Sequence, residues 1–371
     1  MKAAGIKVYD FSLGEPDFPT PEHICKAAEA AMKAGHTHYT PVNGIPELKA
    51  AICKWYKNYH GLECLPEQVL VSNGAKHSIH NALAGTCNPG DEVIIPTPYW
   101  VSYSDLVQMT GAKAVLVHTT AAAGFKMTPA QLKAAITPKT RLVMLNSPSN
   151  PTGKVYTRDV LAALVDVIVP TDVAILSDEI YEQLTYGDAK PTCIATLRPE
   201  MKERMITISG ASKSYAMTGW RMGWTIAPKP IIDAMGNIQS QETSCPSSVS
   251  QYALLAALEG PQQCVADMLK EFEVRRDIVA AGLKKIPGIT FPMPEGAFYM
   301  FFDCSAYFGK SPGGAPITDD VSFCKNALEI AHVNLVPGSA FGSPGYARMS
   351  YATSRQELNG GLEQLTKWLA S

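Results

Sequence analysis

The sequence lacks the features that mark membrane proteins, nucleic-acid-binding proteins and disulfide frameworks. No apolar stretch approaches the ~20 residues that a membrane helix needs. The 371 residues carry a formal net charge of −2 and no basic run, so we expect no nucleic-acid partner. The nine cysteines include no Cys-x-x-Cys pair and follow no secretory signal, which predicts reduced thiols in a cytoplasmic protein.

Nucleotide-binding and metal-binding motifs are missing as well. Neither G-x-G-x-x-G nor G-x-x-x-x-G-K-[ST] occurs, which argues against dinucleotide and P-loop chemistry. His77 and His80 have the i, i+3 spacing of a helical metal pair, but no third ligand accompanies them at a recognisable spacing. We therefore expect no metal site.

The pattern of apolar runs predicts an α/β fold. The predicted strands are Gln68–Ser72, Glu92–Pro96, Ala114–His118, Arg141–Asn146, Val173–Ser177, Met205–Ser209 and Trp224–Ala227. Helical patterns lie between most of them, at Lys76–Thr86, Ser102–Thr110, Pro129–Ile136 and Thr157–Val169. This alternation predicts right-handed βαβ units, and hence a mostly parallel seven-stranded sheet sandwiched by helices.

Length and composition favour a second, smaller domain. The chain exceeds the ~250–300 residues at which single cores usually stop growing. After a helical stretch that ends near residue 285, the pattern changes to short strands, Gly296–Phe302 and Arg348–Ala352, and a closing helix, Gln356–Leu369. We expect residues 39–285 to form the large domain, and residues 1–38 with 286–371 to form a smaller α+β domain.

Polar residues gather where the predicted strands end. They occupy residues 73–76, 99–100, 146–150, 178–181 and 209–213. Ligands of open parallel sheets bind beyond the carboxyl ends of the strands, so one pocket is expected to collect these residues.

The run from Ser209 to Gly223 indicates the chemistry of that pocket. Lys213 stands among small residues at the end of a strand, and Arg221 follows within a Gly-Trp-Arg-Met-Gly turn. A desolvated lysine has a lowered pKa and suits Schiff-base chemistry, while an arginine can hold a phosphate as a fork. An aldehyde and a phosphate together indicate pyridoxal phosphate.

Each of these positions also has an ordinary structural interpretation. The turn at residues 72–76 can be a plain helix N-cap, and Asp178 can cap the segment that follows its strand. Tyr181 and Asn150 are of types that occur in many turns, and Trp100 can be a core residue. The residue types alone leave these alternatives open.

Nine segments in order resemble class I, fold-type I pyridoxal-phosphate aminotransferases, in the branch that includes aspartate and prephenate aminotransferases. The segments are FSLGEPDFPTPEHI, HTHYTPVNGIPELKAAI, SNGAKHSI, NPGDEVIIPTPYWVSY, LNSPSNPTGKVY, LSDEIYEQLTYG, SGASKSYAMTGWRMGW, EGAFYMF and ARMSYATS. Individually several are weak, whereas their order along almost the whole chain is specific. The resemblance implies the fold-type I large domain and pyridoxal 5′-phosphate as cofactor.

The resemblance also implies roles for particular residues. The implied catalytic residues are Lys213, Asp178 and Tyr181. The implied cofactor-binding residues are Lys213, Asp178, Tyr181, Asn150, Trp100, Ala75, Lys76, Arg221, Ser209 and, from the neighbouring subunit, Tyr39. The implied substrate-binding residues are Gly14, Ser12, Trp100, Asn150, Arg348 and Lys76. Because Tyr39 is expected to act in trans, the resemblance implies a homodimer with shared active sites.

The implied reaction is a ping-pong transfer of an amino group between aspartate or glutamate and a 2-oxo acid: 2-oxoglutarate, oxaloacetate or prephenate. Two alternatives keep the cofactor: a lyase or synthase of the same fold, and an aminotransferase for aromatic or other neutral amino acids. A non-catalytic effector domain is a third hypothesis. It would need a DNA-binding extension, which the sequence lacks.

Overall fold

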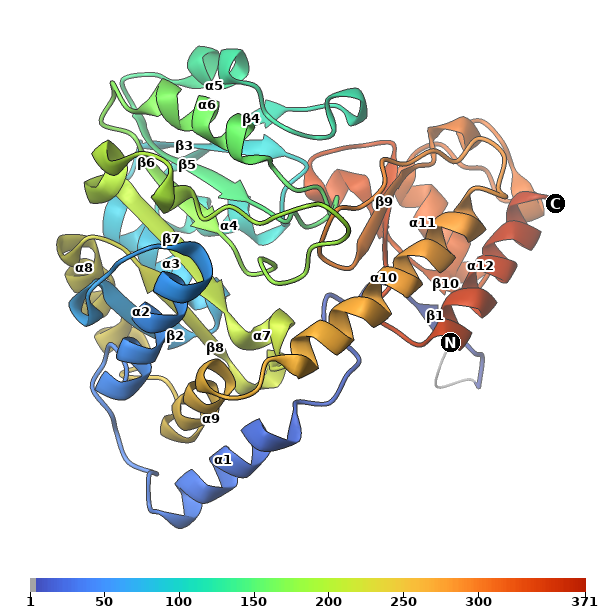
Figure 1. The fold of residues 1–371 in the computed structure, drawn as a ribbon. Helices are drawn as coiled ribbons and strands as arrows, with labels where there is room; N and C mark the ends of the chain where they lie inside the picture. Colours follow the sequence, from blue (N-terminus) through green and yellow to red (C-terminus); the bar gives the residue numbers. More distant parts are fainter. Residues whose placement is uncertain (1–4) are drawn as a thin grey trace.

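Seven strands form the central sheet of the computed structural model, which describes residues 5–371 (Figure 1). They are β2 (Val69–Asn73), β3 (Glu92–Thr97), β4 (Lys113–His118), β5 (Thr140–Asn146), β6 (Ala174–Asp178), β7 (Met205–Gly210) and β8 (Met222–Ile226). Their order is β2-β8-β7-β6-β5-β3-β4, and only β8 runs against the others. The predicted sheet is confirmed, with every strand end within two residues of its predicted position.

Helices cover both faces of this sheet (Figure 1). One face carries α3 (Ala75–Thr86), α4 (Ser102–Met109) and α8 (Lys229–Glu242). The other carries α2 (Pro46–His60), α5 (Pro129–Ala135), α6 (Arg158–Ile168) and α9 (Ser248–Glu259). Successive side chains of a strand point to opposite faces. Accordingly, Ile206 and Ile208 of β7 pack under α3 and α8, whereas Met205 packs with α6.

Apart from the single turn at Ala211–Ser214, three helices of the large part were not predicted: α2, α8 and α1 (Glu22–Lys33). In α1 the apolar stripe is narrow, since only Ile24, Ala28 and Ala31 are buried. This helix packs against α9, and Ile24 and Ala28 share a core with α2. The predicted division, which assigned residues 1–38 to the smaller domain, is therefore wrong for α1. A contact with a helix more than 200 residues away leaves no local signal.

The smaller part is built around a three-stranded antiparallel sheet of order β11-β12-β9. Its strands are β9 (Tyr299–Asp303), β11 (Val336–Pro337) and β12 (Tyr346–Ser350), and its helices are α11 (Asp320–Glu329) and α12 (Arg355–Leu369). Strand β9 begins three residues later than predicted because Ala297 adopts a left-handed conformation, with φ of 55°.

Two segments connect the parts. Near the N-terminus, β1 (Tyr9–Asp10) pairs with β10 (Val333–Asn334), and Phe11 enters the smaller core. The long helix α10 (Gln263–Leu283) leaves α9 and buries Phe272 and Leu283 in that same core (Figure 1). The remaining domain boundaries stay a prediction, and residues 1–4 lie outside the described residues. Among residues 5–371, no helix is long and apolar enough to cross a membrane.

Candidate active site

A cavity of about 440 Å³ lies at the carboxyl ends of the parallel strands. That volume is within the usual range for a small-molecule site. Ten of the thirteen predicted site residues line it: Gly14, Ala75, Lys76, Trp100, Asn150, Asp178, Tyr181, Lys213, Arg221 and Arg348. The strand ends thus bring together residues that are up to 334 positions apart.

Lys213 enters the cavity from α7 (Ala211–Ser214), one turn that follows directly on β7. Its Nζ donates a hydrogen bond of 2.6 Å to the carbonyl oxygen of Gly14. Burial lowers the pKa of Lys213 to about 8, and the nearby Glu15 carboxylate limits that fall. A lysine with this pKa has an appreciable neutral fraction near neutral pH and can act as a nucleophile or a base.

Asp178 ends β6 and is buried at the floor of the cavity. Its Oδ2 accepts a hydrogen bond of 2.6 Å from the hydroxyl of Tyr103, and its Oδ1 accepts one of 3.2 Å from the backbone N–H of Ile180. Burial raises the pKa of Asp178 to about 6, and the Tyr103 hydrogen bond opposes that rise. This carboxylate suits a protonated nitrogen of a bound ring.

Aromatic and amide side chains form the walls around these two groups. The hydroxyl of Tyr181 lies 2.7 Å from that of Tyr299, and both residues are buried. Trp100 packs edge to face on Tyr103, with 5.5 Å between ring centroids. Asn150 also lines the cavity, and its Oδ1 accepts a hydrogen bond from the Arg348 guanidinium. The cavity is therefore lined by both aromatic rings and polar groups.

One end of the cavity is built for an anion. Gly74 precedes α3 with φ of 87°, and a Cβ there would collide with Nη2 of Arg221. The N-terminus of α3 at Ala75 therefore stands beside the guanidinium, which is anchored by a 2.8 Å hydrogen bond from Nη1 to the Thr218 carbonyl. Free N–H groups at a helix N-terminus and an arginine together favour a phosphate.

Arg348 supplies a second cation, which is buried in the cavity wall. It donates to Oδ1 of Asn150 at 3.0 Å and to the carbonyl of Ser12 at 2.6 Å, and its Nε is buried without a partner. In the described part of the chain it forms no ion pair. Burial lowers the pKa of Arg348. A buried guanidinium with neutral partners and a free donor calls for an anionic ligand.

Three predicted residues lie outside the cavity lining. Ser12 is close by through its carbonyl, which holds Arg348. Tyr39 is 89% exposed, and its proposed role toward a second subunit stays a prediction. The prediction that Ser209 binds the cofactor is wrong: its hydroxyl donates to Oε1 of Glu182 at 2.9 Å. Strand alternation turns Ser209 to the other face of the sheet.

The prediction from sequence missed several lining residues. Tyr103, Ser212 and Tyr299 belong to the cavity, as do Phe341 and Val336. Tyr103 lies in the first turn of the predicted helix Ser102–Thr110, directly after the strand-end residues 99–100, and this position was an available signal. The expectation that His77 and His80 hold no metal stays a prediction; both imidazoles approach the Glu242 carboxylate, at 3.2 and 2.8 Å.

Known proteins resemble this chain along almost its whole length. The family model "Aminotransferase class I and II" matches residues 6–365. The chain is 50% identical over 360 residues to the aspartate/prephenate aminotransferase of Cereibacter sphaeroides, covering 96% of the chain and 90% of that relative. It is 47% identical to an aspartate aminotransferase of Rhizobium meliloti, over 98% of the chain and 90% of the relative.

A solved structure agrees with these matches. The crystal structure of the aspartate aminotransferase from Rhizobium meliloti superposes with a TM-score of 0.97 at 46% identity, covering all of this chain and 93% of that one. An aromatic aminotransferase of Pyrococcus horikoshii also matches, with a TM-score of 0.93 at 38% identity. By the match of its sequence to the family model and to these relatives, and by its fold, the chain belongs to the class I and II aminotransferase family.

Proposed function

We propose that the protein is a pyridoxal-phosphate-dependent aminotransferase that moves an amino group between aspartate or glutamate and a 2-oxo acid: 2-oxoglutarate, oxaloacetate or prephenate. One observation carries the proposal: Lys213, a desolvated lysine, shares a cavity with Arg348, a buried arginine that lacks a counterion among the described residues. The lysine suits an aldehyde, and the arginine suits the α-carboxylate of an amino acid.

The residues present fit pyridoxal phosphate. The N-terminus of α3 at Ala75 and the Arg221 guanidinium beside it, which both line the cavity, would hold the phosphate. Asp178 would hold the proton on the ring nitrogen, and Asn150 and Tyr181 would hydrogen-bond the phenolic oxygen. When bound, the cofactor supplies an aldehyde for the amino group and a ring that accepts electrons from the substrate Cα.

The side chains of this protein would perform four tasks. Lys213 would hold the aldehyde of the cofactor and, when free, would carry a proton to and from the substrate Cα. Asp178 would keep the ring nitrogen charged, Trp100 would pack against the ring, and Arg348 would fix the substrate through its α-carboxylate. A misplacement of about 1 Å at the reacting carbon can cost ~100-fold in rate, so this fixation matters as much as the proton transfer.

Lys76 is proposed to select acidic substrates. It lies in the cavity wall, exposed, with Nζ 4.9 Å from the centroid of the Trp100 ring. An ammonium on a flexible stem makes a point-charge contact, which accepts distal carboxylates at more than one distance. Two of the relatives above are named for aspartate, one of them also for prephenate, and this supports the choice.

A half-reaction screen tests the proposed function. The holoenzyme is mixed with single amino acids, and the cofactor absorbance is followed. Aspartate, glutamate and arogenate should convert the cofactor, and Lys76→Ala should raise the apparent KM for the acidic substrates ~10-fold more than that for a monocarboxylic one. Equal losses with both substrate types, together with cofactor release, would make Lys76 a phosphate ligand. Net formation of ammonia from the amino acid would favour the lyase alternative.

The proposal includes a homodimer in the cytoplasm. Tyr39 projects from the surface with 89% of its side chain exposed, which supports a role at a partner subunit's phosphate. The nine cysteines are free, which supports a reducing compartment. Mixing the inactive Tyr39→Phe and Lys213→Ala variants should form hybrid dimers with one intact site and so restore activity. No recovery despite subunit exchange would place Tyr39 at its own subunit's site.

A further inference from the structure

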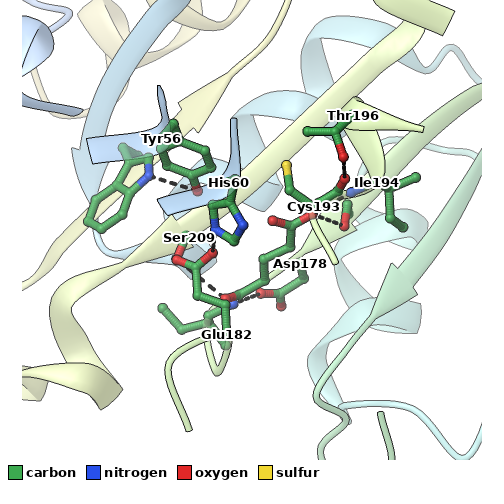
Figure 2. A network of polar contacts seen from close by, with 12 residues as sticks. Tyr56, His60, Asp178, Glu182, Cys193, Ile194, Thr196 and Ser209 are labelled. Carbon is green, nitrogen blue, oxygen red and sulfur yellow. Dashed lines mark hydrogen bonds and ion pairs between the residues drawn. The ribbon is translucent and has the colours of Figure 1, made fainter. Parts of the chain in front are cut away.

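A buried polar cluster lies on the face of the sheet opposite the cavity, directly behind Asp178. We call His60, Glu179, Glu182 and Ser209 the back-face cluster. Figure 2 shows His60 facing Glu182 and Ser209, with Asp178 on the adjoining segment. Nε2 of His60 lies 2.7 Å from Oε2 of Glu182, and the hydroxyl of Ser209 donates to Oε1 of Glu182 at 2.9 Å. The proposed function leaves all four residues without a role.

Two carboxylates share this cluster with one imidazole. The side chains of His60 and Glu182 are only 4% and 3% exposed. Glu179 is also buried; its Oε1 accepts hydrogen bonds from Ser177 and from the backbone of Ile194. In the described residues, His60 is the only basic side chain in an ion pair with Glu182. Isolated buried charges are strongly disfavoured, so the state of this imidazole decides the charge of the cluster.

The cluster is joined to the cavity through the backbone. Glu179 follows Asp178 directly, and its N–H donates to the carbonyl of Ile208 at 2.8 Å, which ties the end of β6 to the end of β7. These two strand ends carry Asp178 and lead to Lys213. The Glu182 carboxylate is also near enough to raise the pKa of Asp178, although burial of Asp178 is the larger cause.

We propose that His60 is a positioning residue of the reaction: its imidazolium compensates the charge of Glu182 and thereby keeps Asp178 ionised on the other face of the sheet. The proposal rests on the proposed function, in which ionised Asp178 holds the proton on the cofactor ring. Without the imidazolium, Glu182 places a second negative charge behind Asp178. Asp178 would then take up a proton at a higher pH and no longer hold the ring nitrogen in its charged form.

Of the titratable groups around His60 and Glu182, Glu179 is part-ionised near pH 7, because burial and the charge of Glu182 raise its pKa to about 7. The remaining groups stay neutral. Burial raises the pKa of Tyr59 to about 12 and holds the pKa values of Tyr56 and of the Cys193 thiol well above their ordinary values. On the cavity side, Asp178 faces the hydroxyl of Tyr103 and the Lys213 amine. Burial alone would lower the pKa of His60, but the hydrogen bond with Glu182 and the charges of Glu182 and Glu179 raise it overall. The raised pKa favours the imidazolium.

A set of three variants separates charge from packing. In His60→Gln, the acidic limb of the pH–rate profile of the half-reaction should move to higher pH by roughly one unit. The cofactor should also dissociate more readily at pH 6. In the double variant His60→Gln/Glu182→Gln, both properties should return toward wild type because the uncompensated charge is gone. His80→Gln removes an imidazole from the exposed His80–Glu242 pair and should change neither property.

A double variant that is as impaired as His60→Gln, or more so, would reduce His60 to a packing residue and overturn the proposal. A second measurement does not depend on stable variants or on the cofactor: the titration of His60 in the apoprotein, followed by NMR. Its pKa should lie above 6.5, and a value below that would overturn the proposal even if the protein proves to be an aminotransferase. Failure of the proposed function would appear separately, as a wild-type holoenzyme without any half-reaction.

Discussion

The two faces of the sheet meet at the same strand ends, yet they bury charge in opposite ways. On the cavity face, the half-buried Lys213 and the buried Arg348 are cations that form no ion pair among the described residues, and Nε of Arg348 lacks a hydrogen bond. On the back face, Glu179 and Glu182 surround the single imidazole of His60. The cavity is thus complementary to an anionic ligand, whereas on the back face one imidazole compensates one of two carboxyl groups and Oε2 of Glu179 is buried without a hydrogen bond.

Neighbouring residues of one segment serve these two faces. Asp178 points into the cavity and Glu179 points away from it, as alternation along an extended chain requires. Burial raises the pKa of Asp178 to about 6 and, together with the charge of Glu182, raises that of Glu179 to about 7. The two carboxyl groups differ in their neighbours. Asp178 faces Tyr103 and Lys213, whereas Glu179 faces a second carboxylate, that of Glu182.

The largest effect is expected from Asp178→Asn. This change keeps the volume of the side chain and removes the anion on the cavity face. We expect turnover to fall ~100- to 1,000-fold, equivalent to about 3–4 kcal/mol, which is typical when one electrostatic partner of the transition state is removed. Single-turnover kinetics with aspartate measures it. Near-normal turnover would show that the ring nitrogen is held in another way.

The same variant should gain stability without the cofactor. The folded pKa of Asp178, about 6, lies above the ordinary value of 3.8. The protonated carboxyl therefore stabilises the fold fully below about pH 4, and this contribution is lost as the pH rises through 6. We expect the Asp178→Asn apoprotein to be more stable than wild type by roughly 1–3 kcal/mol at pH 8, with little difference at pH 4. Urea unfolding at both pH values decides; an equal difference at both would contradict the assignment.

A smaller effect is expected from Tyr103→Phe. The hydroxyl of Tyr103 donates to Asp178 at 2.6 Å and favours its ionised form. Without this hydroxyl, the acidic limb of the pH–rate profile of the half-reaction should move to higher pH, and the rate at pH 6 should fall ~10-fold. Tyr156→Phe removes another buried hydroxyl, which accepts from the backbone of Met127, and serves as the matched control. Equal pH profiles for the two variants would contradict a specific role of Tyr103.

The smallest effect on the cofactor is expected from Ser209→Ala. Its hydroxyl serves the back face, so cofactor affinity should stay within about twofold of wild type, while stability falls by about 1 kcal/mol. Ser212→Ala makes the same change in a residue that lines the cavity and should weaken cofactor binding several-fold. If Ser209→Ala weakened cofactor binding more than Ser212→Ala, the division between the two faces would be wrong.

The sequence was informative where the signal is local and periodic. Buried strands such as Met205–Gly210 stand out as apolar runs, and the rule that ligands bind at strand ends predicted the place of Lys213 and Asp178. The error for Ser209 came from treating every strand-end residue as part of one pocket. Side chains along β7 alternate between the two faces of the sheet, and this alternation predicts that Ser209 points away from the face of Ile208.

Long-range contacts were beyond prediction from a single sequence. His60 meets Glu182 across 122 residues, and α1 packs on α9 across more than 200. Neither contact has a local pattern, because the pairing depends on which helix covers which face of the sheet. The same holds for Tyr299, which reaches the cavity from the smaller part of the molecule.

The most direct test of the central claim is to find which lysine binds the cofactor aldehyde. The holoenzyme is reduced with borohydride, digested, and the labelled peptide is identified by mass spectrometry. We predict that the label lies on Lys213 alone, and that Lys213→Ala protein takes up none. A label on Lys76 or on any other lysine, or an unlabelled wild-type protein with cofactor present, would contradict the account.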